Sequence, residues 1–252
     1  MMSRRYSQAR RLHFTSCMDP DNADRLLWLI ERRHSSRAPF DPARQVTPAA
    51  LAQVVEAARW APTAHNMQNF HLVIVDDPRI LETLGHIRAP VSPAFIVENY
   101  RQLSWSADEL AARKVGILGT QFPPAWRTSD PDQAPANLVR PLGESIAGAP
   151  TVIVVVFDPT QRAPASEGDV LGMISLGCVL ENMWLAAHAA HLDVQVVSAF
   201  AGPAVESEVR QALHIPSPWR VAYALRLGHA LANAQDPHVR RDPETFVHRN
   251  CF

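Results

Sequence analysis

Four polar side chains precede a short apolar run in the stretch APTAHNMQNFHLVIV, residues 61–75. They are Thr63, His65, Asn66 and Gln68, and the β-branched run after them, residues 70–75, predicts a strand that leads into the core. Asparagine and glutamine amides donate and accept hydrogen bonds in one plane, so they match the edge of a heterocyclic ring or the hydroxyls of a polyol. An ordinary Asx-rich loop has the same composition. The stretch by itself leaves a ligand-binding loop and a plain loop both open.

A second polar cluster lies in RRHSSRAPF, residues 32–40. Arg33, His34, Ser35 and Arg37 place two guanidinium groups, an imidazole and a hydroxyl close together in the chain. These donors suit a phosphate monoester, because each arginine–phosphate bond is worth about 1.5–3 kcal/mol. A solvated basic helix end, favoured by the helix dipole, accounts for the same residues. On this stretch alone the helix end is the better explanation.

Two further stretches have weaker signals. VVSAFAG, residues 196–202, ends a predicted strand in small residues, so backbone N–H groups at Val197, Ser198 and Ala199 can approach a flat ligand. VRRDPETFV, residues 239–247, contributes Arg240 and Arg241 near the C-terminus. A plain strand end and a charged tail are the alternatives.

Composition and missing motifs narrow the function. The net charge of −1 gives no overall field that favours nucleic acid or a membrane surface. The sequence has no G-x-G-x-x-G, G-x-x-x-x-G-K-[ST], G-x-S-x-G or H-E-x-x-H motif, which argues against Rossmann, P-loop and α/β-hydrolase chemistry and against a zinc protease. His188 and His191 have no carboxylate or cysteine at matching spacing, so we expect no metal site. Three cysteines without a CxxC pair fit a reducing cytosol, and we expect a cytoplasmic protein.

The order of predicted elements indicates an α+β protein with a central sheet covered by helices. Thr47 is the expected N-cap of the second helix, which Pro62 stops. The apolar stretch 170–190 is interrupted by Glu181, Asn182 and His188, which favours a core helix over a membrane span. Helices are predicted over 21–33, 47–62, 80–85, 107–118, 169–193 and 204–213, and strands over 70–75, 149–158, 194–200 and 219–228.

The chain divides into a flexible basic tail, residues 1–23, and a single domain, residues 24–252. Within the domain, residues 89–142 are proline-rich and irregular, and a segment of this length is more often a functional lid than a plain loop. Its aromatic side chains could line a substrate site or form the core of the lid, and the two interpretations are equally good. These side chains are Tyr100, Trp105, Phe122 and Trp126.

Taken together and in this order, the stretches resemble the nitroreductase family of FMN-dependent oxidoreductases. The family's R-[RH]-S-x-[RK]-x-F motif is matched from Arg33 to Arg37, with Pro39 inserted before Phe40. A second family motif, aArwAPSagNxQPW, is matched by AARWAPTAHNMQNF. AGAPTVIVVV, the apolar helix, VSAF, LRLGHA and VRRDPETFV follow in family order, so the resemblance covers about residues 24–246 apart from the insertion.

The resemblance implies a nitroreductase-like fold, with a central mixed sheet flanked by helices, in a domain-sharing homodimer. It implies bound FMN, NAD(P)H as electron donor, ping-pong hydride transfer to a nitroaromatic, quinone or similar small acceptor, and no side chain acting as general acid or base. The phosphate would be bound by Arg33, His34, Ser35 and Arg37 with Arg240 or Arg241, and Arg33 or Arg37 would stabilise the reduced ring. The partner's loop would contribute Pro62, Thr63, Ala64, Asn66 and Gln68, and Val197, Ser198 and Ala199 would lie at the ring edge. The expected partners are a second copy and a small substrate, with no nucleic acid or membrane.

The chain departs from the family pattern at several positions. Asn69 and Phe70 replace the usual Pro-Trp, and Ser198 stands where several members carry glutamate or another polar residue. The insertion is compatible with lidded branches of the family, which include dehalogenases, azoline oxidases and flavin-consuming benzimidazole synthases. A flavin-binding protein without turnover is a further alternative.

Overall fold

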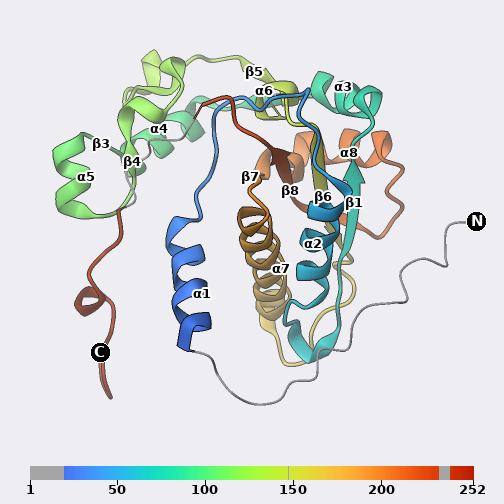
Figure 1. Cartoon of the computed structure of the whole chain (residues 1–252). Coiled ribbons are helices and arrows are strands. Elements are labelled where there is room, and N and C mark those ends of the chain that lie inside the picture. Colours follow the sequence, from blue (N-terminus) through green and yellow to red (C-terminus); the bar gives the residue numbers. More distant parts are fainter. Residues whose placement is uncertain (1–19, 147, 233–238) are drawn as a thin grey trace, which may run out of the picture. The chain divides into compact units, whose positions relative to one another are not determined.

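The computed structural model describes residues 20–146, 148–232 and 239–252, in two compact units, Met1–Arg33 and His34–Phe252 (Figure 1). The first unit contains helix α1, Pro20–Arg32, where the sequence predicts residues 21–33 to be helical. Residues 20–23 therefore begin a helix and are not part of a tail, while residues 1–19 of the predicted tail lie outside the described residues.

The second unit is built on a four-stranded sheet with the order β1-β6-β8-β7. The strands are β1 His71–Val75, β6 Thr151–Phe157, β7 Asp193–Val197 and β8 Arg220–Gly228. The predicted α+β class and the predicted strands are confirmed. All three strand pairs are antiparallel, so the expectation of a mixed sheet is wrong for the described residues of this chain.

Strand β7 is shorter than the predicted strand 194–200. After Val197 the chain turns into a 3-10 helix, Ser198–Ala201, in which the Phe200 side chain is completely buried. The N–H of Gly202 closes the turn on the carbonyl of Ala199 at 3.1 Å. Small residues allow this turn directly at the strand end.

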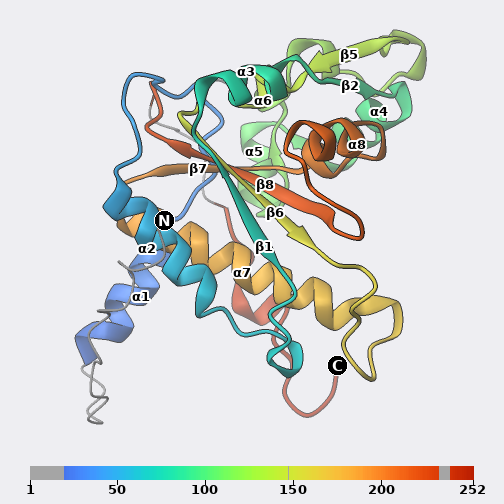
Figure 2. The same cartoon turned by 90° about the vertical axis from the view of Figure 1, so that its right-hand side faces the viewer.

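Helices cover both faces of the sheet, as Figure 2 shows. On one face lie α2, Pro48–Arg59, and α7, Val170–Ala189, which pack on the β6 side chains of Ile153 and Val155. Thr47 caps α2 as predicted, its hydroxyl accepting from the Ala50 N–H at 3.2 Å. A single apolar run in β6 can therefore serve both helix layers, since alternate residues face opposite sides.

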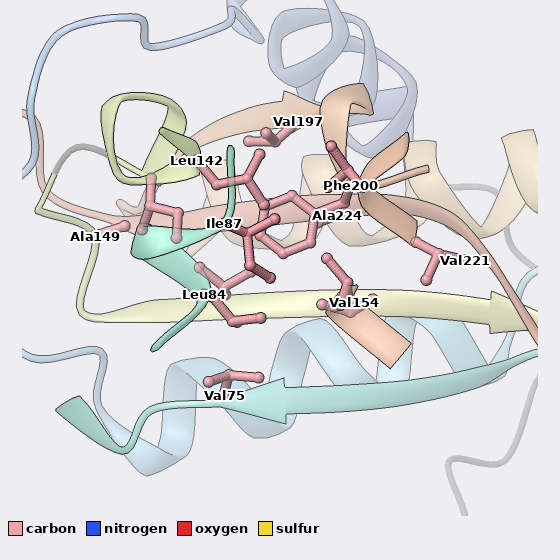
Figure 3. Close-up of a cluster of buried hydrophobic side chains, with 14 of the residues drawn as sticks. Val75, Leu84, Ile87, Leu142, Ala149, Val154, Val197, Phe200, Val221 and Ala224 are labelled. Atoms are coloured by element: carbon pink, nitrogen blue, oxygen red, sulfur yellow. The ribbon is translucent and has the colours of Figure 1, made fainter. Parts of the chain in front are cut away.

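The other face carries α3, Pro78–His86, α6, Leu142–Ile146, and α8, Pro203–Ala212. Figure 3 shows the core beneath them, where Leu84, Leu142 and Phe200 meet Val154 of β6 and Ala224 of β8. Glu206 of α8 is buried and accepts a two-pronged ion pair from Arg220 at the start of β8. The predicted helices at 80–85 and 204–213 are confirmed.

The insertion is folded. Strands β2, Arg88–Val91, and β5, Leu138–Pro141, pair antiparallel and close it at its base. Between them lie α4, Pro93–Leu103, β3, Ser104–Trp105, α5, Ala107–Arg113, and β4, Ile117–Leu118. The predicted helix 107–118 ends early because Lys114 and Gly116 take positive φ values of 55° and 90°. The expectation that this segment is irregular is therefore wrong for most of it, and its role as a lid stays a prediction.

Helix α7 is buried on one side only. With the turn before it, Glu167–Ala189 is long and apolar enough to cross a membrane by length and composition, and 22% of its apolar 18-residue window is buried. A core helix of a soluble protein passes the same test. Leu176, Val179 and Met183 are buried against α2 and the sheet, as predicted for a core helix, while Val170, Met173 and Ile174 are exposed.

Candidate functional site

The basic segment, residues 34–40, is extended and runs along the ends of β7 and β8. Ser36 and Phe40 are buried, whereas Arg37 between them is exposed. The Ser36 N–H donates to the carbonyl of Val194 at 2.9 Å, and Phe40 forms an isolated bridge with Ala230. The segment therefore follows the inward and outward alternation of a strand, which directs Arg37 away from the core.

The backbone of this segment is held by the buried Arg226 of β8. Its guanidinium donates to the carbonyls of Ser36 and Ala38 at 2.8 Å and of Ile146 at 3.1 Å, and it lies 4.3 Å from the ring centroid of Phe40. Burial lowers the pKa of Arg226 to about 10, so the group is still a cation at neutral pH. No motif in the sequence singles out Arg226, although an arginine inside the apolar run RVAYALRLG is itself a signal of a buried partner.

His34 has partners inside the protein. Its Nε2 lies 3.2 Å from the Ser36 hydroxyl and 3.6 Å from Asp193 Oδ1, and its carbonyl accepts from Trp184 Nε1 at 3.1 Å. Ser36 in turn donates to Asp193 Oδ1 at 2.6 Å. These contacts give His34 a structural role, and its contact with a cofactor stays a prediction. Ser35 is half-buried, and Arg33 ends the first unit with its N–H on the Leu29 carbonyl at 3.0 Å.

The polar loop 61–69 has an unusual backbone. His65, Asn66 and Gln68 have left-handed φ values of 51°, 55° and 48°. Asparagine and histidine are among the non-glycine residues that tolerate this region best. The Gln68 N–H donates to the Thr63 hydroxyl at 3.1 Å, and the Gln68 amide donates to Asn66 Oδ1 at 3.0 Å. The loop is thus shaped mainly by its own residues.

Two residues of this loop, Ala64 and Asn69, hydrogen-bond to segments elsewhere in the domain. The Ala64 N–H donates to the Ser175 hydroxyl of α7 at 2.9 Å. The Asn69 amide donates to the carbonyls of Asp158 and Gln161 at 2.8 and 3.0 Å, and accepts from the Asp158 N–H at 3.0 Å. Asn69 therefore fixes the loop in this chain, where the family carries proline. Pro62, Asn66 and Gln68 remain exposed, and Thr63 and Ala64 are half-buried.

The strand-end residues are arranged as expected for close approach by a ligand. Val197 is buried at the end of β7, while Ser198 is exposed and Ala199 half-buried in the following turn. The backbone at Ser198 and Ala199 thus lies at the surface beside a buried anchor. Contact with a flavin edge stays a prediction.

Arg240 and Arg241 lie in the C-terminal segment 239–252, which is almost entirely exposed. Arg240 donates to the carbonyl of Val239 at 2.7 Å, and Arg241 lies 5.5 Å from the Phe246 ring. An ion pair at 2.6 Å joins Asp242 to Lys114 at the end of α5. Neither arginine is placed beside Arg37 by any contact within the described chain.

The insertion aromatics pack against one another and against arginines. Tyr100 and Phe122 meet edge to face at 5.5 Å. Arg113 covers Trp105 at 3.9 Å and Arg140 covers Trp126 at 5.6 Å. This packing favours the lid-core interpretation over a substrate wall, and substrate contact stays a prediction for all four aromatics.

The basic segment and the polar loop lie at opposite ends of the sheet. The loop leads into His71, which pairs with Val156 at the end of β6, while the basic segment contacts Val194, whose partner Leu227 pairs with Thr151 at the start of β6. The seven residues of β6 span about 20 Å. Both regions also contact α7, at Ser175 and Trp184, whose separation corresponds to about 14 Å of helix.

Neither of two cavities in the described part of the chain joins these regions. A cavity of about 20 Å³ lies beneath the loop, lined by Thr63, Asn69, Asp169 and Ser175 among others, and it is far too small for a flavin. A hollow of about 530 Å³ lies between α3 and α6 and contains no predicted site residue. Among the described residues, no group of three or more His, Cys, Asp or Glu side chains could hold a metal ion.

Comparison with known proteins decides the family. A family model described as the nitroreductase family matches residues 30–229. The chain belongs to the nitroreductase family. The match covers the basic segment, the polar loop and the strand-end residues, but it stops before Arg240 and Arg241. No curated protein matches this member of the family in sequence.

Solved structures share the nitroreductase fold at low sequence identity. A putative NADH dehydrogenase/NAD(P)H nitroreductase from Parabacteroides distasonis is 16% identical, with a TM-score of 0.56 over 90% of this chain and 99% of the other. A nitroreductase with bound FMN from Bacteroides fragilis is 20% identical, with a TM-score of 0.55 over 88% and 98%. A putative nitroreductase in complex with FMN from Desulfovibrio desulfuricans is 20% identical, with a TM-score of 0.55 over 94% and 99%. The predicted family and fold are confirmed.

Proposed function

We propose that this protein is an FMN-dependent oxidoreductase. The observation that carries the proposal is the exposed Arg37 on a rigidly held segment, within residues that match the nitroreductase family. The similar structures from Bacteroides fragilis and Desulfovibrio desulfuricans are described with FMN bound. The donors present here suit that group, since they comprise a guanidinium for a phosphate and exposed amides at Asn66 and Gln68 for a heterocyclic ring.

We further propose that the site is shared by two copies of the chain. The basic segment and the polar loop lie at opposite ends of the sheet, so one copy would supply the first and its partner the second. The apolar side chains at the start of α7 support this arrangement. Val170, Met173 and Ile174 are 58%, 48% and 56% exposed, and a second copy would cover them.

The flavin would supply the redox chemistry, taking a hydride from NAD(P)H and passing it to a small acceptor such as a nitroaromatic or a quinone. The chain's own groups bind and orient. Arg37 would hold the phosphate, and a guanidinium near the ring would favour negative charge on its reduced form. The backbone of Ser198 and Ala199 would meet the ring edge, and no side chain is assigned as general acid or base. A soluble, cytoplasmic setting is part of this proposal.

The visible absorption spectrum of the purified full-length protein, recorded anaerobically before and after adding NADPH, tests the proposal. A flavin spectrum that bleaches on addition is the expected result. A flavin spectrum that persists after both NADPH and NADH would remove the reductase activity and direct attention to the lidded branches or to a protein without turnover. A colourless protein that does not bind added FMN would overturn the proposal.

A further inference from the structure

Arg226 bridges the residues on both sides of Arg37. One nitrogen, Nη2, lies 2.8 Å from the Ser36 carbonyl and 2.8 Å from the Ala38 carbonyl. The other, Nη1, donates to the Ile146 carbonyl at 3.1 Å. With only 1% of its surface exposed, Arg226 is the largest of the fully buried side chains of the described residues. It comes from the far end of the chain, and its main contacts are with the backbone that carries Arg37.

Asp193 holds the same segment from the neighbouring strand. Its Oδ1 accepts from the Ser36 hydroxyl at 2.6 Å, and its Oδ2 accepts from the Ala230 N–H at 2.9 Å. The segment is thus fixed by a buried cation from β8 and a carboxylate from β7, in addition to the backbone bond from Ser36 to Val194. Constraints on residues 36 and 38 leave the residue between them little freedom in φ and ψ.

We propose that Arg226 and Asp193 are positioning residues that fix the direction in which Arg37 presents its guanidinium to the flavin phosphate. This inference rests on the proposed function. A need for stability alone explains the arrangement poorly, because replacing a buried charged group with well-packed apolar residues is often neutral or stabilising. The planar guanidinium bonds the Ser36 and Ala38 carbonyls through one nitrogen and the Ile146 carbonyl through the other, an arrangement that the single ammonium of lysine cannot reproduce.

The test compares affinity for FMN with affinity for riboflavin, which lacks the phosphate. Dissociation constants are measured by flavin fluorescence for the full-length wild type, Arg226→Lys and Arg226→Met. Arg220→Met is the matched control, since Arg220 lies on the same strand, also forms a strong ionic contact, and does not touch residues 36–38. A role in stability alone would weaken both ligands together, whereas a positioning role lowers the preference for FMN.

We expect the wild type to prefer FMN over riboflavin by a factor of about 100 or more, and both Arg226 variants to lose about tenfold or more of that preference. Arg220→Met should keep the wild-type ratio even if its melting temperature falls. Unchanged ratios in the folded Arg226 variants would overturn the inference. A loss in Arg226→Met but not in Arg226→Lys would overturn it as well, because charge alone would then be sufficient.

If neither Arg226 variant folds, Ser36→Ala decides the question, because it removes the hydroxyl bonded to Asp193. We expect its FMN-to-riboflavin preference to fall by about threefold or more, and an unchanged preference overturns the inference. A wild type that binds neither flavin would contradict the proposed function. A wild type that binds both flavins equally would leave flavin binding intact and contradict the positioning role alone.

Discussion

The basic segment and the polar loop are both polar surface features, yet they are held in different ways. The loop 61–69 is shaped by hydrogen bonds among its own residues and by three left-handed backbone positions. The segment 34–40 is shaped by residues 157 to 190 positions away, Asp193 and Arg226. The loop's form is therefore a local property, whereas the form of the segment depends on the completed sheet.

This difference has a consequence for function. The segment takes its distant partners from both β7 and β8, so phosphate binding would depend on that half of the sheet being folded. The loop needs only two attachments, at Ser175 and through Asn69. In a dimer, the rigid half of each site would thus come from one copy and the locally shaped half from the other.

The largest expected effect comes from a variant that separates the two copies of the chain. The basic segment of one copy would then lose the polar loop of its partner. Ile174→Glu places a charge on the exposed apolar part of α7, and we expect a shift from dimer to monomer with near-complete loss of FMN binding. Sedimentation velocity and a flavin titration measure both. Glu167→Gln, at an exposed polar position in the turn before α7, serves as the control. A monomer that keeps wild-type FMN affinity would disprove the shared site.

The next effect isolates the basic segment. Arg37→Ala should raise the dissociation constant of FMN by about 10–100-fold, because one charge-assisted phosphate contact is lost. Riboflavin affinity and the melting temperature should change little, since Arg37 is exposed. Fluorescence titration measures the affinity for each flavin, and thermal unfolding measures the melting temperature. Wild-type FMN affinity in this variant would show that the motif does not bind the phosphate.

A third variant tests how the loop is attached. Asn69→Ala removes three hydrogen bonds to residues 158 and 161, and we expect it to lower the free energy of unfolding by about 1–3 kcal/mol. Gln45→Ala is the control, because its side-chain amide donates one exposed hydrogen bond, to the Pro42 carbonyl, and the loss of that bond should cost about 0.5 kcal/mol or less. Urea unfolding measures both. Equal effects would mean that Asn69 does not anchor the loop.

The smallest effect is a pH dependence at the basic segment. Burial, followed by the nearby Arg44, lowers the pKa of His229, whose backbone carbonyl accepts from the Asp41 N–H, while Asp193 and Asp41 act in the opposite direction. The unfolded chain then binds the proton more readily, so stability is lost as pH falls through the ordinary histidine range near 6.5. His229→Gln should flatten this slope in unfolding experiments between pH 8 and about 5. The same slope in the variant would assign the effect elsewhere.

Several features could be predicted because their causes are local. The N-cap Thr47 and the apolar run of β6 have signatures within a few residues. Helix α4 was missed although Ser92 caps it and Pro93 begins it, since the prolines around it suggested an irregular segment. The expectation of a mixed sheet failed because strand direction depends on how distant segments pair, which no local pattern specifies.

The sequence by itself determined the family, the α+β class and the places where the polar site residues stand, since motif spacing and short-range patterning are properties of the chain. Only the tertiary structure decided that Arg226 and Asp193 hold the basic segment, that Asn69 anchors the loop, and that the two regions lie at opposite ends of β6. These are contacts between residues 89 to 190 positions apart. Their formation depends on the pairing of the strands, and the physical reason is that burial makes each polar group take a partner wherever the fold supplies one.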